Sequence, residues 1–271
     1  MIEFLQITND PQLAALCDTL PAMRLFVDLE RNGKAQRQAG RNTFISEHTM
    51  EDISRMAAAV TKTRLMVRLN PVYDGTAAEV DEAISRGAGM LMLPMFSGTG
   101  DLGVFCRQVA GRAPVVALLE NTDALQSIDQ WIGTPGLAEV FLGLNDLHLS
   151  LRMAFMFEPL AAGIVDSVAA RVQAEGLRFG FGGMARLDEG LLPGRMVLGE
   201  HLRLGSQAVI LSRGFRAQVD EAGYVAEIQA LRVAEAALRL RTTDEIQQNC
   251  LYVRQLIGDI ATKTRAASAP A

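Results

Sequence analysis

The chain has 271 residues and 49% of them are hydrophobic, so it is long enough to bury one large core. Its formal net charge of −5 is small and lies in no long run of like charges, which argues against nucleic acid or an anionic membrane as a partner. No apolar run reaches the length of a membrane span and no signal-peptide pattern follows Met1, so we expect a cytoplasmic protein. The three cysteines are far apart, and we expect Cys17, Cys106 and Cys250 to be reduced structural thiols.

From the N-terminus onward, short apolar runs alternate with amphipathic segments, a pattern typical of βα units on a parallel sheet. Eight runs are the predicted strands: Glu3–Ile7, Leu25–Leu29, Leu65–Leu69, Gly89–Leu93, Val115–Leu119, Val140–Leu144, Arg178–Phe181 and Ala208–Leu211. Eight βα units in a chain of this length predict an α/β fold of the (β/α)8 TIM barrel type. An open, doubly wound sheet is the alternative, and it is disfavoured because no GxGxxG follows the first strand.

Helical patterns fill the gaps between these strands. Thr49-Met-Glu-Asp52 predicts a capped helix start, with an acidic residue that complements the helix dipole. Two further helices are predicted over Ala77–Arg86 and Leu160–Glu175, ending at Gly87 and Gly176.

Two helical patterns follow Phe215, where a barrel needs only one more helix. The first, Gln218–Arg239, completes a barrel domain over residues 1–240, and residues 241–271 are predicted to form an additional C-terminal helix with a frayed tail. The pattern over Thr242–Lys263 places five side chains on one helical face: Ile246, Cys250, Val253, Ile257 and Ile260. That face packs either on its own barrel or against another subunit. We favour another subunit, which predicts a homo-oligomer.

Two acidic residues follow predicted strands, Glu120 directly after Val115–Leu119 and Asp146 just after Val140–Leu144. Because the carboxyl ends of parallel strands share one rim, we expect both carboxylates to face one cavity. Two adjacent carboxylates repel each other unless a cation or a proton lies between them, and Mg²⁺ is a suitable cation. A bound 2-oxo acid such as pyruvate could then be polarised toward its enolate. The alternative is that both acids are helix N-caps or partners of arginines.

Arg68 lies near the end of its predicted strand, and an arginine in a barrel wall is costly unless it has an anionic partner. At the rim its guanidinium is predicted to contact the enolate oxygen or the substrate carboxylate. The alternative is a structural salt bridge to Glu30 or Glu120. Asp28 and Glu30 share one face of the preceding strand, and Glu30 is predicted to orient Arg68 or a metal-bound water in preference to acting as a general base.

The segment from Arg31 to His48 is long for a βα connection. Its cationic residues are Arg31, Lys34, Arg37 and Arg41. It is either a solvated surface turn, which we favour, or a cationic lid over an anionic substrate. No two histidines have metal-ligand spacing, which disfavours zinc, but His148 follows Asp146 closely enough to line the same pocket.

Glycines mark the end of the seventh predicted strand, in Phe179-Gly-Phe-Gly-Gly-Met-Ala-Arg186. They either let backbone amides approach a ligand, as in barrels that bind phosphate after the seventh and eighth strands, or only permit a tight turn. The sequence leaves both interpretations open.

Five segments, taken in order, resemble the HpcH/HpaI aldolase and citrate lyase β-subunit family. They are Phe26-Val-Asp-Leu-Glu30, Val67-Arg-Leu-Asn70, Met92-Leu-Pro94, Leu119-Glu-Asn121 and Phe141-Leu-Gly-Leu-Asn-Asp-Leu147. The resemblance implies a (β/α)8 barrel in which Glu120 and Asp146 hold Mg²⁺ or Mn²⁺ and Arg68 stabilises the enolate. It also implies that backbone amides near Asn145 and Asp146 hold the substrate carboxylate, and that C-terminal helices pack between subunits.

The sequence departs from this family directly after Glu30. The aldolase branch has a histidine there and the citrate lyase branch an acid, whereas this chain has Arg31. The leading hypothesis is a divalent-metal-dependent carbon–carbon lyase of the aldolase type, acting on a 2-oxo acid with an aldehyde or acyl co-substrate. An acyl-coenzyme A ester lyase or synthase is one alternative, although no coenzyme A pocket is evident. A non-catalytic ligand-binding barrel is the other.

Overall fold

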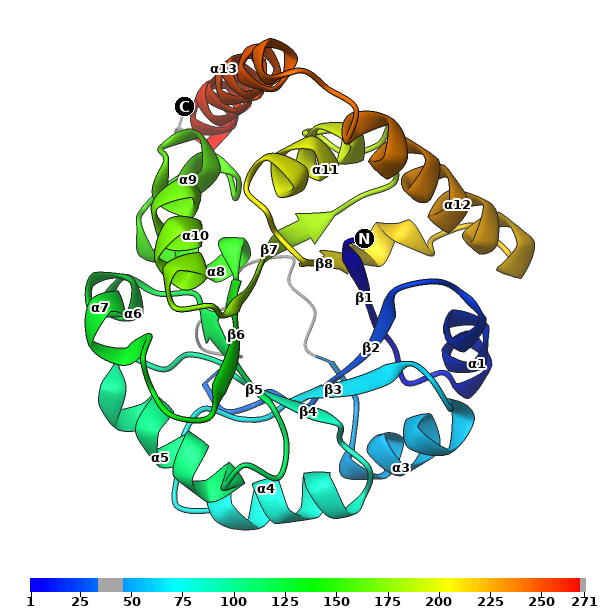
Figure 1. Ribbon diagram of the computed structural model, residues 1–271, viewed down its shortest axis with the longest axis vertical. Helices are drawn as coiled ribbons and strands as arrows, with labels where there is room; N and C mark the ends of the chain where they lie inside the picture. Colours follow the sequence, from blue (N-terminus) through cyan, green and yellow to red (C-terminus); the bar gives the residue numbers. More distant parts are fainter. Residues whose placement is uncertain (34–45, 269–271) are drawn as a thin grey trace. The chain divides into compact units, whose positions relative to one another are not determined.

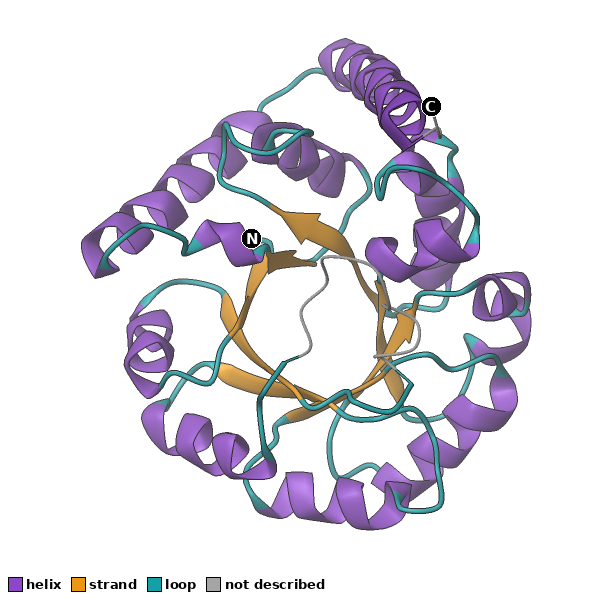
Figure 2. Cartoon of the chain, turned by 180° about the vertical axis from the view of Figure 1, so that it is seen from behind, coloured by secondary structure: helices purple, strands orange, loops and turns teal. Residues whose placement is uncertain are grey.

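The computed structural model describes residues 1–33 and 46–268. Eight strands close into a barrel in sequence order, from β1 to β8. The strands are β1 (Glu3–Ile7), β2 (Met23–Asp28), β3 (Arg64–Arg68), β4 (Met90–Leu93), β5 (Val115–Leu119), β6 (Leu137–Leu142), β7 (Arg178–Met184) and β8 (Ala208–Leu211). The predicted (β/α)8 barrel is therefore confirmed, and helices alternate with the strands (Figure 2).

The helices of the first half are α1 (Pro11–Thr19), α3 (Met50–Ala59), α4 (Thr76–Ser85), α5 (Thr99–Val109), α6 (Thr122–Gln126) and α7 (Ile128–Trp131). Those of the second half are α8 (Leu144–Ser150), α9 (Glu158–Ala161), α10 (Ile164–Ala174), α11 (Gly194–Arg203), the 3-10 turn η1 (Arg213–Phe215), α12 (Glu221–Leu238) and α13 (Thr243–Ser268). None of the helices within the described ranges is both long and apolar enough to cross a membrane.

The chain forms two compact units. One consists of Phe4–Leu119 and Asp123–Phe141, and it carries β2 to β5 with α3, α4 and α5 alongside (Figure 1). The other consists of Met1–Glu3, Glu120–Thr122 and Leu142–Ala271, and it carries β7, β8 and the helices from α8 onward. Lys34, Arg37 and Arg41 of the predicted cationic loop lie outside the described residues, as does the end of the predicted tail, 269–271.

Side chains inside the first unit are arranged in layers along β2. Because alternate residues of a strand share a face, Arg24, Phe26 and Asp28 point to the same side. At one level the guanidinium of Arg24 donates to both carboxylate oxygens of Glu139, at 2.8 and 2.9 Å, and both side chains are fully buried. At the next level Phe26 pairs with Met66 of β3. Beyond it lies Asp28, at the end of the strand where the candidate site begins.

Three sequence predictions need correction at the level of secondary structure. The helix predicted over Leu160–Glu175 is divided into α9 and α10, because Gly163 has a left-handed backbone with φ of 77°. Strand β6 begins earlier than expected, and Leu144 is already the first residue of α8. Strand β7 extends to Met184 through an irregular pairing with β8 between Gly180 and Gly183. The predicted capped start of α3 is confirmed, since the Asp52 carboxylate accepts the backbone N–H of Thr49 at 2.7 Å.

The predicted C-terminal helix is α13, and it packs on α9 and α11 of the same unit (Figure 1). Val253, Ile257 and Ile260 of the predicted apolar face are buried by this packing. Ion pairs fasten the helix as well: Arg254 reaches Asp166 of α10 at 3.4 Å, and Arg265 pairs with Glu158 of α9. Part of this face is therefore covered by its own chain, and packing of the helix against another subunit stays a prediction.

The three cysteines are thiols outside any disulfide, as predicted. Cys17 and Cys106 are buried and Cys250 is partly buried. Burial raises the pKa of Cys106 to about 11, and it also raises the pKa of Cys250. Both of these thiols are therefore mostly protonated at neutral pH.

Candidate active site

The predicted site residues fall into two groups, one in each compact unit. The first group lies at the carboxyl ends of β2 and β3 and is called here the Arg68 cluster: Asp28, Glu30, His48, Arg68 and Asn70. The second is called the acid pair and consists of Glu120 and Asp146.

The guanidinium of Arg68 is held mainly by Asp28. Its Nε and Nη2 atoms donate to the two oxygens of that carboxylate at 2.8 and 2.7 Å. The Nη1 atom lies 3.4 Å from an oxygen of Glu30, which supports the prediction that Glu30 orients Arg68. The guanidinium also lies over the ring of Phe26, 5.6 Å from its centroid. The alternative considered from sequence was a salt bridge to Glu30 or Glu120, and the principal partner, Asp28, was not expected.

Strand register explains this pairing. Asp28 and Arg68 are direct partners in the ladder between β2 and β3, so their side chains leave neighbouring backbone positions on the same face. A largely buried arginine needs an anion, and a bidentate carboxylate fixes the plane of the guanidinium as well as its charge.

Asn70 fixes the start of the segment that follows β2. Its side-chain oxygen accepts the backbone N–H groups of Arg31 and Asn32, both at 2.9 Å. Its side-chain nitrogen donates to Glu79 of α4 at 2.5 Å. Burial raises the pKa of Glu79, and this effect outweighs the hydrogen bonds from Asn70 that favour the charged form.

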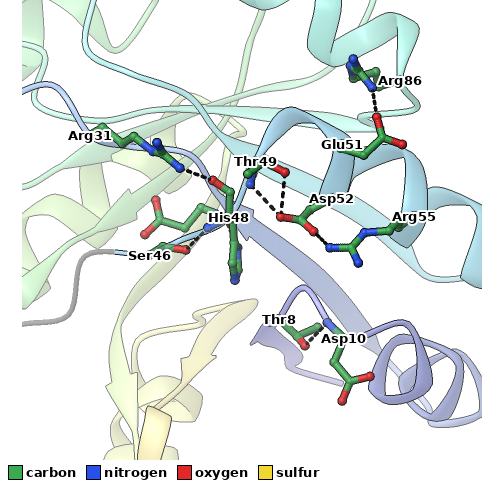
Figure 3. A network of polar contacts seen from close by, with 11 residues as sticks. Thr8, Asp10, Arg31, Ser46, His48, Thr49, Glu51, Asp52, Arg55 and Arg86 are labelled. Carbon is green, nitrogen blue, oxygen red and sulfur yellow. Dashed lines mark hydrogen bonds and ion pairs between the residues drawn. The ribbon is translucent and has the colours of Figure 1, made fainter.

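His48 belongs to this cluster, although the sequence indicated only that it lies near a helix start. The backbone N–H of Asp28 donates to Nδ1 of His48 at 3.0 Å. The side chain of Arg31 donates to the carbonyl oxygen of His48 at 3.0 Å, so the two ends of the 31–48 segment are joined (Figure 3). No local sequence pattern could have revealed the contacts of His48 with Asp28 and Arg31, because these partners are far apart along the chain.

The acid pair lies in the second unit. Glu120 is the first residue after β5 and is buried, and Asp146 lies in the first turn of α8, partly exposed. Neither is the N-cap of α8, a position that Gly143 occupies. Asp146 is therefore positioned by a helix.

A hydrogen-bonded contact joins the segments that carry these two acids. The backbone N–H of Thr122 donates to the hydroxyl of Ser150 at 2.9 Å, and that hydroxyl donates to the Thr122 hydroxyl at 3.1 Å. Thr122 follows Glu120 by two residues, and Ser150 lies one helical turn after Asp146. The contact therefore connects the start of α6 to the end of α8.

Asn145 and His148 occupy α8 beside Asp146. Asn145 is exposed, consistent with access to a ligand. His148 is buried, and its Nδ1 lies 3.0 Å from the carbonyl oxygen of Leu144, one turn back in the helix. Because a carbonyl only accepts, Nδ1 of His148 carries a proton and its ring is fastened to the helix backbone.

The glycines of β7 form a bulge in the pairing with β8, between Gly180 and Gly183, and approach of their backbone amides to a ligand stays a prediction. Gly182 has φ of 59°, a left-handed conformation that favours glycine. A Cβ atom at this position would come within 3.1 Å of the side chain of Leu144, the first residue of α8. The bulge thus packs directly against the helix that carries Asp146.

One further histidine is deeply buried in this unit. The ring of His201 in α11 stacks on Phe181 with centroids 3.8 Å apart, and its Nδ1 lies 2.7 Å from the hydroxyl of Ser206. Burial lowers the pKa of His201 to about 3, so the ring is neutral at physiological pH. It serves packing and is not part of either group of site residues.

No protein-family model matches the chain, and no curated protein is similar to it in sequence. Solved structures, in contrast, match over most of its length. An HpcH/HpaI aldolase from Desulfitobacterium hafniense DCB-2 is 14% identical with a TM-score of 0.60, covering 89% of this chain and 94% of its own. The chain has the HpcH/HpaI aldolase fold.

Two other structures share the HpcH/HpaI fold with this chain. A citrate lyase from Burkholderia xenovorans LB400 is 12% identical with a TM-score of 0.61, covering 97% of this chain and 92% of its own. The protein CitE from Mycobacterium tuberculosis, in complex with magnesium, acetoacetate and coenzyme A, is 15% identical with a TM-score of 0.54, covering 86% of this chain and 80% of its own. The family resemblance noted in five short segments is thereby confirmed at the level of the fold.

Proposed function

We propose that the protein is a divalent-metal-dependent carbon–carbon lyase of the aldolase type, acting on a 2-oxo acid through a pyruvate-like enolate. The observation that supports this most is the acid pair: two carboxylates follow successive strands, and the Thr122–Ser150 contact joins their segments. The HpcH/HpaI fold adds support, since the CitE structure that shares it contains magnesium.

The donor set of the acid pair suits a hard cation. In the described part of the chain no three or more His, Cys, Asp or Glu side chains come together as a metal site. The proposed ion would have Glu120 and Asp146 as its protein ligands, with water and substrate oxygens as the others. Mg²⁺ and Mn²⁺ accept such a set, because Mg²⁺ commonly takes only one or two carboxylates. When bound, the cation supplies Lewis acidity toward the keto oxygen of the substrate.

The remaining roles belong to this chain's own side chains. Asp28 holds the guanidinium of Arg68 in one plane, and in this proposal the preorganised charge of Arg68 stabilises the oxygen that becomes negative when the bond to C3 breaks. Glu30 restrains the same guanidinium from its Nη1 side. In this proposal the exposed start of α8 at Asn145 and Asp146 receives the substrate carboxylate. The aldehyde or acyl co-substrate and a homo-oligomeric assembly belong to the proposal as well.

Metal binding tests the proposal most directly. We expect Mn²⁺ titration, followed by electron paramagnetic resonance, to show one site whose affinity falls about tenfold or more in Glu120→Gln and in Asp146→Asn. Asp123→Asn is the matched control, because Asp123 is an exposed carboxylate close to Glu120 in sequence, and it should bind Mn²⁺ like the unaltered protein. Equal Mn²⁺ affinity in all four proteins would refute the metal site.

Catalysis is tested by deuterium exchange at the methyl group of pyruvate in D₂O, followed by NMR with and without Mg²⁺ or Mn²⁺. Exchange that requires the metal and is lost in Glu120→Gln supports the enolate. Metal binding without exchange, combined with measurable affinity for coenzyme A, would favour the acyl-coenzyme A lyase or synthase. Pyruvate or oxalate binding without any turnover would favour a non-catalytic barrel.

A further inference from the structure

Three contacts locate His48 at the end of β2. Its Nδ1 accepts a hydrogen bond from the backbone N–H of Asp28. Its carbonyl oxygen accepts one from the side chain of Arg31, and its backbone N–H donates to the Ser46 hydroxyl at 3.2 Å (Figure 3). The residue is buried, with 7% of its surface exposed. Directly after it, Thr49 is the N-cap of helix α3, so His48 is held between the end of a strand and the start of a helix.

The direction of the Asp28 contact fixes the protonation of the ring. A backbone N–H can only donate, so Nδ1 of His48 must present a lone pair. A neutral ring then carries its proton on Nε2. This is the opposite arrangement to His148, whose Nδ1 faces a carbonyl and must carry a proton.

Asp28 is therefore held at two points that serve different partners. Its backbone N–H donates to His48, while its carboxylate accepts two hydrogen bonds from the guanidinium of Arg68. One carboxylate oxygen also accepts the backbone N–H of Glu30 at 3.2 Å. A chain of contacts thus runs from the imidazole through Asp28 to the guanidinium.

We propose that His48 is a positioning residue whose unprotonated Nδ1 fixes Asp28 and, through it, the orientation of Arg68. The proposal rests on the proposed function for the role of Arg68 in turnover, but the contact itself does not depend on it. A proton on Nδ1 would place two N–H groups face to face, which breaks the contact with Asp28. Protonation of His48 therefore releases Asp28. The activity then falls as the pH is lowered through the titration of His48, and this fall is called the acid limb of the pH profile.

Charged groups of both signs lie on the elements next to His48. On the side of β2 and β3 are the carboxylates of Asp28 and Glu30 and the guanidinium of Arg68. Arg31 follows β2 and donates to the His48 carbonyl. From α3 comes Asp52, which binds Thr49 and is paired with Arg55. From the end of β1 comes Asp10, whose carboxylate is engaged as the N-cap of α1.

Two substitutions separate positioning from packing. The side-chain oxygen of His48→Asn offers an acceptor near the place of Nδ1 but does not titrate, whereas His48→Leu fills the space without an acceptor. With metal-dependent pyruvate exchange as the readout, we expect His48→Leu to lower kcat by about 10- to 100-fold with a smaller change in KM. His48→Asn should recover most of that loss, and its acid limb should be absent. An acid limb in His48→Asn equal to that of the unaltered protein would overturn the proposal.

NMR tests the contact without any catalytic assay. Correlation of the imidazole nitrogens with their ring protons should show His48 as the Nε2–H tautomer and His148 as the Nδ1–H tautomer. The backbone amide signal of Asp28 should shift with the titration of His48 over the range of about pH 5 to 8, and should not do so in His48→Asn. An Nδ1–H tautomer at His48 would overturn the inference. So would an Asp28 amide signal that does not shift when His48 titrates. Failure of the proposed function would instead abolish exchange and leave these NMR results intact.

Discussion

Arg68 and Asp28 face each other across adjacent strands and share a two-point hydrogen bond, Nε to Oδ1 at 2.8 Å and Nη2 to Oδ2 at 2.7 Å. A lysine has no planar fork and cannot reproduce this geometry. We expect Arg68→Lys and Asp28→Asn each to reduce metal-dependent pyruvate exchange by about 100-fold, because a charge displaced by about 1 Å from its place is costly in catalysis. Steady-state kinetics measures the effect. Unchanged Mn²⁺ affinity in both variants would show that the acid pair remains intact.

The buried ion pair between Arg24 and Glu139 predicts strongly non-additive stability effects. Arg24→Met or Glu139→Met alone leaves a charge without its counterpart in a dry interior, and we expect a loss of about 3–5 kcal/mol in the free energy of unfolding. The double variant Arg24→Met/Glu139→Met should lose much less, because no charge is left behind. Urea denaturation of the four proteins gives the coupling. Additive losses would contradict this interpretation.

His201 predicts a specific dependence of stability on pH. Its pKa is about 3 in the folded chain, below the value of 6.5 for an ordinary histidine, so the unfolded chain takes up a proton first as pH falls. The stability that the neutral ring contributes is complete above pH 6.5 and is lost progressively between pH 6.5 and about 3, at up to about 1.4 kcal/mol per pH unit.

Unfolding free energies measured from pH 8 down to pH 5 should therefore decline less steeply in His201→Phe than in the unaltered protein. The phenyl ring keeps the stack on Phe181 and cannot be protonated. Parallel curves for the two proteins would assign the acid sensitivity to other groups.

Gly182 predicts a link between the β7 bulge and the acid pair. Gly182→Ala adds a Cβ at a left-handed position and against Leu144, so we expect a loss of about 1–3 kcal/mol in stability together with weaker Mn²⁺ binding. Gly258→Ala is the control, because Gly258 lies in α13 with nothing within 4 Å of the place that an added methyl group would take, and alanine favours helix. That variant should gain about 0.5–1 kcal/mol and bind Mn²⁺ normally. Thermal unfolding and the metal titration give both quantities.

Much of the fold follows from the sequence because the alternation of apolar runs with helical patterns is a local signal. All eight strands were located, and the capped start of α3 and the glycine stops at Gly87 and Gly176 hold in the structure. The failure at Gly163 has a physical cause. A single glycine inside an apolar helical pattern is compatible with a continuous helix, and only packing decides that it adopts a left-handed conformation.

The site was harder to predict from the sequence. Its contacts depend on the register between neighbouring strands and on which residues distant in sequence come together. Alternation indicated that Asp28 and Glu30 share a face, but the choice of Asp28 as the main partner of Arg68 depends on which residues pair across β2 and β3. The contact of His48 with Asp28 depends on the path of the chain between them. The metal-binding role of Glu120 and Asp146 stays a prediction.

The burial of the native thiols offers an experimental opening. Two of the three sulfurs are inaccessible, and the third has a raised pKa, so maleimide reagents should modify them slowly at neutral pH. A single cysteine introduced on an exposed helix would then accept a fluorophore or nitroxide selectively in the otherwise unaltered polypeptide. Distance measurements with these labels could then follow the barrel during substrate turnover without replacement of the native cysteines.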